Sequence, residues 1–193
     1  TYEEIKGLDA SRAFRREDGK DYPVTHIPTL DETLKEVKGS RLYCNIEIKR
    51  NEHNAGIEEE VVRVIEENDY TDLCDVTSQD YETLEKIRSI SPEVLTAYTT
   101  VIGMGDIENL EAVDILSVQE SFATFREVQR LRAAGKKIFV WTVNDENTME
   151  KLISLNVDAI LTNRPDVGQE VLDGHQTTAG DILARLNEVL TNF

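Results

Sequence analysis

One stretch of the sequence distinguishes between two possible architectures: Leu42-Tyr43-Cys44-Asn45-Ile46-Glu47-Ile48-Lys49. Apolar and polar residues alternate along it, and this pattern predicts a β-strand whose side chains point to opposite faces. A central strand of an open parallel sheet is usually apolar on both faces. A barrel strand, in contrast, can carry polar groups inward near its carboxyl end. In a barrel Glu47 and Lys49 would point together into the mouth, whereas in an edge strand they would form a half-buried ion pair.

Five further runs of apolar and β-branched residues predict strands. They lie at residues 73–78, 94–98, 113–118, 137–143 and 158–162. The strand starts are spaced about 20 to 30 residues apart, which leaves room for one crossover helix each time. The predicted class is therefore α/β with parallel neighbouring strands.

The segments between the strands have the periodicity of amphipathic helices, with apolar residues three to four positions apart. The apolar stripes are Ile57, Val61, Val62, Val64 and Ile65; Tyr81, Leu84 and Ile87; Phe125, Val128 and Leu131; and Met149, Leu152 and Ile153. We expect Gly135 to end the third helix and Asn144 to cap the fourth. A further acidic amphipathic helix is expected at residues 180–191.

The number of βα units leaves the architecture open. Six units fit an open, doubly wound sheet better than a closed (β/α)₈ barrel, which needs eight units and about 250 residues. The doubly wound alternative lacks its usual sequence signature, because a dinucleotide site requires G-x-G-x-x-G directly after the first strand. Here Gly103-Met104-Gly105 follows the third predicted strand and lacks the third glycine.

The charge of the chain excludes several classes of partner. With 38 acidic and 21 basic residues the formal net charge is -17. Such a surface repels phosphate backbones, so we expect no nucleic-acid partner and no binding to an anionic membrane surface. An anionic substrate would need a divalent cation between itself and the carboxylates. Cys44 and Cys74 lie in apolar segments, which is typical of buried thiols and not of a disulfide or a zinc site.

A set of short motifs occurs in a fixed order along the chain. The motifs are Thr1-Tyr2-Glu3-Glu4-Ile5 with Leu8-Asp9-Ala10, Ile27-Pro28-Thr29-Leu30-Asp31-Glu32, Asn45-Ile46-Glu47-Ile48-Lys49, Trp141-Thr142-Val143-Asn144 and Leu161-Thr162-Asn163-Arg164-Pro165. The set resembles the second part of the glycerophosphodiester phosphodiesterase family over nearly the whole chain. The resemblance implies a TIM-barrel-like (β/α)₈ phosphodiesterase fold, here lacking about the first two βα units. It also implies hydrolysis of small-molecule glycerophosphodiesters to sn-glycerol 3-phosphate and an alcohol, with a divalent cation, calcium or magnesium, as cofactor.

The resemblance carries roles onto individual residues. Glu47 matches a metal ligand of the family, and Lys49 matches a catalytic-site lysine that faces the substrate phosphate. Trp141 matches an aromatic residue that lines the substrate mouth. Ser78 matches the serine of a Ser-Phe pair and is expected to bind substrate, but Gln79 stands where the family has the apolar Phe.

The family's His-Arg-Gly motif, its paired Glu and Asp ligands and its His-Asp motif would all lie upstream of this chain. His26, His53 and His175 are the only histidines, and none stands in a matching position. In the family two histidines would transfer protons and three carboxylates would hold the cation, whereas Glu47 supplies one carboxylate. The missing motifs correspond to about two βα units, which is also the deficit that the strand count gives.

We divide the chain into residues 1–28, part of a capping insertion; 29–168, the C-terminal six units of the barrel; and 169–193, a C-terminal helix. The leading hypothesis is the C-terminal portion of a phosphodiesterase. The alternative is a non-catalytic α/β binding or interaction module on the same scaffold. Open edges at 42–49 and 158–162 predict either self-association or a missing N-terminal half supplied as a separate polypeptide.

Two further expectations concern the piece itself. By itself it should be inactive and bind divalent cations weakly, because most of the family's catalytic groups would lie upstream. It starts at Thr1 without a signal-peptide pattern, so we interpret it as a processed or trimmed piece. The resemblance leaves open a membrane domain in the full-length parent, as in some bacterial relatives, so a cytoplasmic and a membrane-associated location both stay open.

Overall fold

The computed structural model describes residues 1–12, 22–40, 42–101 and 106–175, which contain one parallel sheet. Its strands are β1 (Cys44–Glu47), β2 (Cys74–Ser78), β3 (Leu95–Thr100), β4 (Ile115–Gln119), β5 (Lys137–Trp141) and β6 (Ala159–Ile160). Each strand pairs in parallel with the next one along the chain, which confirms the predicted class and strand positions. Because the order never reverses, the sheet has no switch point of the kind that defines a doubly wound fold. The sheet is an arc of a (β/α) barrel, and the open doubly wound sheet that the unit count favoured is excluded.

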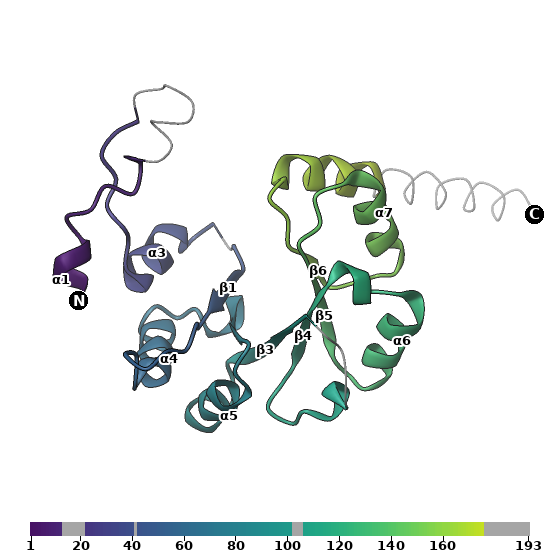
Figure 1. Cartoon of the computed structure of the whole chain (residues 1–193), viewed down its shortest axis with the longest axis horizontal. Coiled ribbons are helices and arrows are strands. Elements are labelled where there is room, and N and C mark those ends of the chain that lie inside the picture. The colour runs from purple at the N-terminus through teal and green to yellow at the C-terminus, as the bar shows by residue number, and fades with distance from the viewer. Residues whose placement is uncertain (13–21, 41, 102–105, 176–193) are drawn as a thin grey trace, which may run out of the picture.

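Helices cover the outer side of this arc (Figure 1). The long connecting helices are α4 (Ile57–Glu67), α5 (Tyr81–Ile90), α6 (Phe125–Ala133) and α7 (Glu146–Ser154). Before the sheet come α1 (Tyr2–Ile5) and α3 (Leu30–Val37), and the short 3₁₀ turns are η1 (Thr71–Leu73), η2 (Ile107–Asn109) and η3 (Glu120–Phe122). Residues 165–175 are helical after β6. The arc of helices is open between α3 and α7, where two further units would complete a barrel (Figure 1).

Apolar burial is concentrated between the sheet and the helices. One cluster of buried side chains extends from Leu34 of α3 to Val94, and a second extends from Leu84 of α5 to Val167. The inner face of the sheet has only a small buried cluster, Ala97, Ile115 and Phe139. Each fully buried aliphatic side chain contributes about 1.5–3 kcal/mol, so the outer layer provides most of the hydrophobic stabilisation.

The helix ends agree with the prediction at Gly135 and differ from it at Asn144. Gly135 follows α6 with a φ of 77°, a conformation in which a side chain would be strained. The cap of α7 is Asp145, whose side chain accepts a hydrogen bond from Thr148 N at 2.9 Å. The expected Asn144 cap is therefore wrong by one position. Phe125, expected on the apolar stripe of α6, is the first residue of that helix and is 67% exposed.

The N-terminal segment is folded back on itself where it is described. Residues 9–11 are tied to residues 23–25 by hydrogen bonds that include the one from Ser11 Oγ to Pro23 O, at 2.9 Å. The assignment of residues 1–28 to a capping insertion stays a prediction, as do the other two divisions of the chain.

Several sequence expectations can be compared directly with the described residues. Cys44 and Cys74 are both free, and Cys74 is buried, as expected. None of the described helices combines the length and the apolar character that crossing a membrane requires. The expected helix at 180–191 and the Gly103-Met104-Gly105 run lie outside the described residues.

The start of α3 gives the first testable prediction. Thr29 Oγ1 accepts from Glu32 N at 3.1 Å, and the Glu32 carboxylate accepts from Thr29 N at 2.8 Å, which forms a capping box. Replacing Thr29 with Ala should lower the free energy of unfolding by about 1 kcal/mol, measured by urea denaturation. Thr33→Ala is the matched control, because Thr33 is exposed one turn later and its hydroxyl bonds only to the Thr29 carbonyl. An equal loss in both variants would contradict the capping role.

Candidate active site

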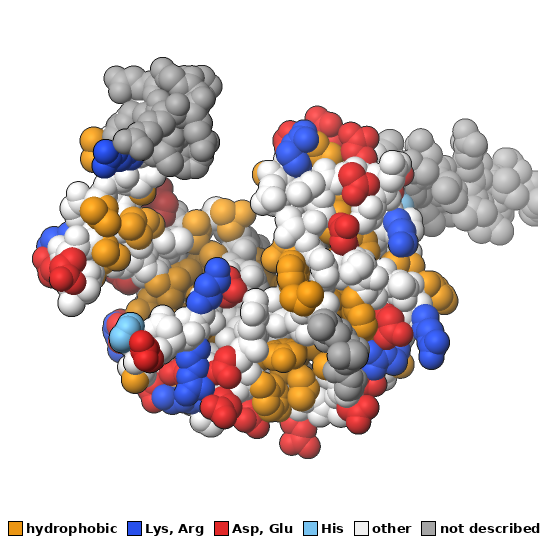
Figure 2. Space-filling view, in the orientation of Figure 1, with side chains coloured by type: hydrophobic (Ala, Val, Ile, Leu, Met, Phe, Trp, Pro, Cys, Tyr) orange, Lys and Arg blue, Asp and Glu red, His pale blue; other side chains and the backbone are white. Residues whose placement is uncertain are grey.

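The carboxyl ends of the strands border a cavity of about 340 Å³ on the inner side of the arc. Figure 2 shows the surface hollowed between the part that carries α3 and the part that carries α7. Residues at or just beyond the ends of all six strands line the cavity: Asn45, Glu47, Thr77, Gln79, Thr99, Ser117, Trp141, Thr142, Leu161, Thr162 and Asn163. Most of them carry hydroxyl, amide or carboxyl groups. In (β/α) barrels this end of the strands is where active sites lie.

Glu47 and Lys49 lie at the end of β1 on the polar face that the sequence predicted. Lys49 Nζ lies 3.3 Å from Glu47 Oε2, and the two side chains are 81% and 37% exposed. Glu47 lines the cavity, and Lys49 lines an adjoining hollow with Ser78 and Gln79. An exposed ion pair of this kind is worth only about 0–1 kcal/mol, so both groups can exchange this contact for a ligand.

Trp141 is the last residue of β5 and is half-buried at the cavity wall. Its indole Nε1 donates a hydrogen bond to Ser117 O of the neighbouring strand, at 3.1 Å. This bond fixes one edge of the ring and leaves the remainder as an apolar wall. The structure therefore brings Trp141 and Glu47 to the same cavity from β5 and β1.

Ser78 lies behind the cavity and not in it. Its side chain is buried, and Ser78 Oγ donates to Ile48 O at 2.9 Å and accepts from Asp80 N at 3.1 Å. Both bonds hold the end of β1 against the start of α5. Because side chains alternate along a strand, the neighbour Gln79 is the one that reaches the cavity. Ser78 also borders the adjoining hollow together with Lys49, and its direct contact with substrate stays a prediction.

Sequence reasoning did not identify the polar residues contributed by the other strands. Thr77 Oγ1 and Thr99 Oγ1 lie 2.8 Å apart and form a hydrogen-bonded pair across β2 and β3. Thr162 and Asn163 line the cavity just beyond β6. The signal that could have identified them is the same for all: a polar residue at the carboxyl end of each predicted strand, in phase with the inner face.

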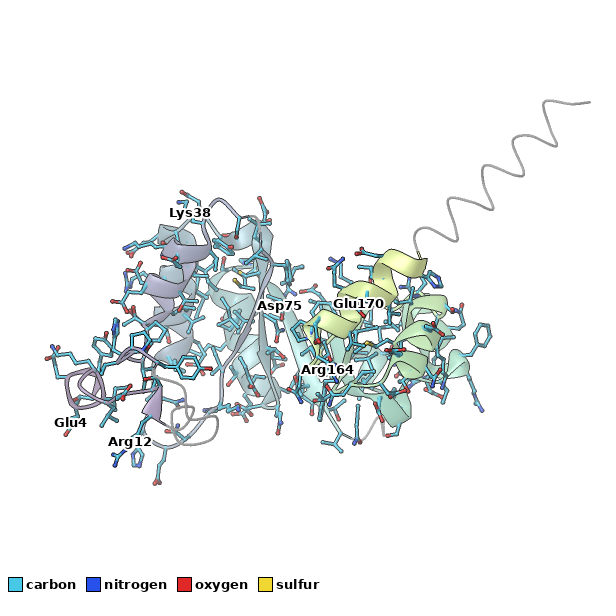
Figure 3. The ribbon with its side chains drawn as sticks, turned by 90° about the horizontal axis from the view of Figure 1, so that it is seen from above. Glu4, Arg12, Lys38, Asp75, Arg164 and Glu170 are labelled. Carbon is cyan, nitrogen blue, oxygen red and sulfur yellow. The ribbon has the colours of Figure 1, made fainter. Side chains whose placement is uncertain are left out.

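A buried carboxyl group, that of Asp75, also lies on the inner face of the sheet, one layer of side chains below the cavity. Asp75 of β2 is fully buried, and one of its carboxylate oxygens, Oδ2, accepts from Asn45 Nδ2 at 2.6 Å. Burial raises the pKa of Asp75 to about 6, although hydrogen bonds from Tyr43 and Asn45 oppose the rise. The other carboxylate oxygen is buried without a hydrogen-bond partner. Figure 3 shows Asp75 in the middle of the molecule, between Lys38 and Glu170.

Comparison with known proteins identifies the family. The sequence pattern of the glycerophosphoryl diester phosphodiesterase family matches residues 1–167. The chain belongs to this family. A glycerophosphodiester phosphodiesterase of Bacillus altitudinis is 32% identical over 86% of this chain and 69% of its own length. A second, from Caldanaerobacter subterraneus, is 27% identical over 86% of this chain and 68% of its own length.

Solved structures of the family have the same fold. An Oleispira antarctica phosphodiesterase, solved in complex with its product sn-glycerol 3-phosphate, is 28% identical, with a TM-score of 0.76 over 90% of this chain and 70% of that one. A glycerophosphodiester phosphodiesterase from Parabacteroides distasonis is 22% identical, with a TM-score of 0.73 over 91% of this chain and 72% of that one. The family is one of TIM-barrel phosphodiesterases, and this chain has six strands of that barrel in order.

Members of this family are metal-dependent. Among the residues that line the cavity, Glu47 is the one carboxylate. Within the described ranges, no group of three or more His, Cys, Asp and Glu side chains could hold a metal ion. Calcium takes six to eight oxygen ligands and magnesium six, so Glu47 by itself fits neither ion. A complete site needs further ligands from outside the described residues.

Proposed function

We propose that this chain forms the C-terminal part of a glycerophosphodiester phosphodiesterase, which cleaves its substrate to sn-glycerol 3-phosphate and an alcohol. The observation that carries the proposal is the Glu47–Lys49 pair at the mouth of a family barrel, beside a polar cavity. The product bound to the Oleispira antarctica relative supports a small-molecule phosphodiester as the substrate class.

Each site residue has a distinct role in this proposal. The exposed Lys49 ammonium neutralises charge on the substrate phosphate, which stabilises the transition state of phosphoryl chemistry. Glu47 provides one oxygen ligand for calcium or magnesium. The indole ring of Trp141, which its hydrogen bond to Ser117 O holds in place, packs against the glycerol moiety. Ser78 supports the site from behind, because Ser78 Oγ donates a hydrogen bond to Ile48 O, between Glu47 and Lys49.

The remaining catalytic groups would come from polypeptide segments outside residues 1–193. Phosphodiester cleavage needs a general acid and a general base, and no histidine is among the residues that line the cavity. We propose that the two βα units that would close the arc supply these groups and the other carboxylates. They would be joined to this chain in a longer parent or supplied as a separate polypeptide.

A second candidate function is a non-catalytic binding or interaction module on the same scaffold. The observation that favours it is the single carboxylate at the cavity, which by itself cannot hold a divalent cation. Under this alternative the polar cavity would bind a glycerophosphate group without cleaving it.

A reconstitution experiment separates these functions. Residues 1–193 should show no cation-dependent hydrolysis of glycerophosphocholine by themselves and only weak binding of calcium or magnesium. Activity should return when the first two βα units of the protein's own gene are restored, in one chain or in trans. A restored barrel without turnover would favour the binding module, and cation-dependent turnover by residues 1–193 as a well-folded monomer would contradict our division of the site.

The same preparation tests the open edges. In the described sheet, β1 pairs only with β2, and β6 pairs only with β5. Unpaired edges present free N–H and C=O groups to other chains, so we expect residues 1–193 to self-associate. Sedimentation analysis should show oligomers that disappear when the missing units are restored. A monomer at all concentrations would contradict this expectation.

A further inference from the structure

Near β6 the sheet fixes the rim of the cavity less firmly than it does near the other strands. This strand has only two residues, and its backbone pairing extends no further than the hydrogen bond from Val143 N to Leu161 O, at 3.0 Å. Thr162 and Asn163 follow immediately and line the cavity. Another interaction has to fix their position, because no strand on the far side of β6 is present among the described residues.

The side chain of Asn144 provides that interaction. Asn144 Oδ1 accepts a hydrogen bond from Asn163 N at 2.9 Å and another from Thr162 Oγ1 at 3.2 Å. Thr162 Oγ1 in turn accepts from Arg164 N at 2.9 Å. One carboxamide oxygen thus holds three consecutive residues of the rim, and we call this group of bonds the rim tether.

Asn144 can do this because it does not cap a helix. Asp145 takes the capping position of α7, which leaves the Asn144 side chain available to the neighbouring loop. Asn144 is not among the residues that line the cavity, but Trp141 and Thr142 are, and they lie three and two positions before it. The rim tether therefore joins the two cavity-lining segments that follow β5 and β6.

We propose that Asn144 is a positioning residue for the phosphodiesterase site. It keeps Thr162 and Asn163 at a fixed distance from Trp141, so that this side of the mouth is preformed for a glycerophosphate ligand. The part of the proposal that concerns the ligand rests on the proposed function, whereas the part that concerns the rim does not. Because this wall is preformed, binding of the ligand costs less conformational entropy.

The single tryptophan of the chain, Trp141, makes the rim directly measurable. Asn144→Ala should make Trp141 fluorescence more sensitive to quenching by acrylamide, which is neutral, and should speed amide exchange at Asn163. Asn144→Asp should restore both readouts, because a carboxylate oxygen can accept the same two hydrogen bonds. Asp145→Ala is the matched control: it removes the cap of α7, which costs stability, and leaves the rim tether intact.

Titration with sn-glycerol 3-phosphate, followed by the same fluorescence, tests the consequence for binding. Loss of the rim tether should weaken binding about five- to tenfold in Asn144→Ala, while Asp145→Ala stays within about twofold of the original chain. Equal quenching and exchange in the Ala variants at 144 and 145 would overturn the proposal. No saturable response in the protein with a restored barrel would instead count against the proposed function, and the ligand-free measurements would still decide the role of Asn144.

Discussion

Replacing Glu47 with Gln should reduce hydrolysis of glycerophosphocholine by about a hundredfold or more in the protein with a restored barrel. The substitution keeps the size of the side chain and removes its charge, at the one carboxylate that lines the cavity. Loss of that charge removes the partner of Lys49, which lies 3.3 Å away, and, under the proposed function, an anionic ligand for the cation. The affinity for calcium or magnesium, measured by calorimetry, should fall together with the rate.

Glu59→Gln is the matched control for this prediction. Glu59 also forms an exposed ion pair, with Lys86 Nζ at 2.9 Å, but it lies on α4 in the outer layer. Its removal should leave both the rate and the cation affinity within about twofold, because an exposed pair contributes at most about 1 kcal/mol. If Glu47→Gln behaved like Glu59→Gln, the metal-ligand role of Glu47 would be wrong.

The second large effect concerns stability and comes from Asp75. In the unfolded chain this carboxyl ionises near its ordinary pKa of 3.8, whereas burial raises the pKa to about 6 in the folded chain. Between these pH values the folded chain keeps a proton that the unfolded chain has released. The free energy of unfolding therefore falls as the pH rises through this window, and the loss is complete by about pH 7. Its size is at most about 3 kcal/mol.

Asp75→Asn should remove this dependence. The amide oxygen can still accept the hydrogen bonds from Asn45 and Tyr43, and no charge is buried. At pH 7 the variant should be more stable by about 1–3 kcal/mol, and its stability should change little between pH 4 and 7 relative to the original chain. Urea denaturation at several pH values measures both effects. Asp72→Asn, at an exposed position three residues earlier, should leave the pH profile unchanged. Equal pH profiles in the original chain and in Asp75→Asn would refute the argument.

The fold was largely predictable because its signals are local. Apolar runs such as 137–143 and stripes such as the one ending at Ile65 lie where the strands and helices are found. The alternation around Glu47 already distinguished the inner face from the outer face. The strand order was not predictable from periodicity, because the same βα units can be wound in one direction or in two. The alternation at residues 42–49 and the missing G-x-G-x-x-G argued against a doubly wound sheet, and the motif resemblance favoured the barrel.

The candidate site was predictable only where a motif marked it. Glu47, Lys49 and Trp141 were identified in this way, and the structure brings the first and the last of them to one cavity. The bond from Ser78 Oγ to Ile48 O was not predictable, because a motif match does not say which face of the strand a side chain occupies. The tether from Asn144 to Asn163 was missed because it joins residues 19 positions apart through a side chain that looked like a helix cap.

The chain-ordered sheet described above has a consequence for biosynthesis. Each strand pairs only with the strand that precedes it and the one that follows it, so the spatial order matches the order of translation. A ribosome adds about 5–20 residues per second, so each strand leaves the ribosome before the next one. Within the described part of the sheet, each newly exposed βα unit therefore finds the edge of the preceding strand already synthesised. In the closed barrel that we propose for the full protein, only the pairing between the first and the last strand has to wait for the end of synthesis. Co-translational folding of the described units can therefore proceed from each strand to the next one along the chain.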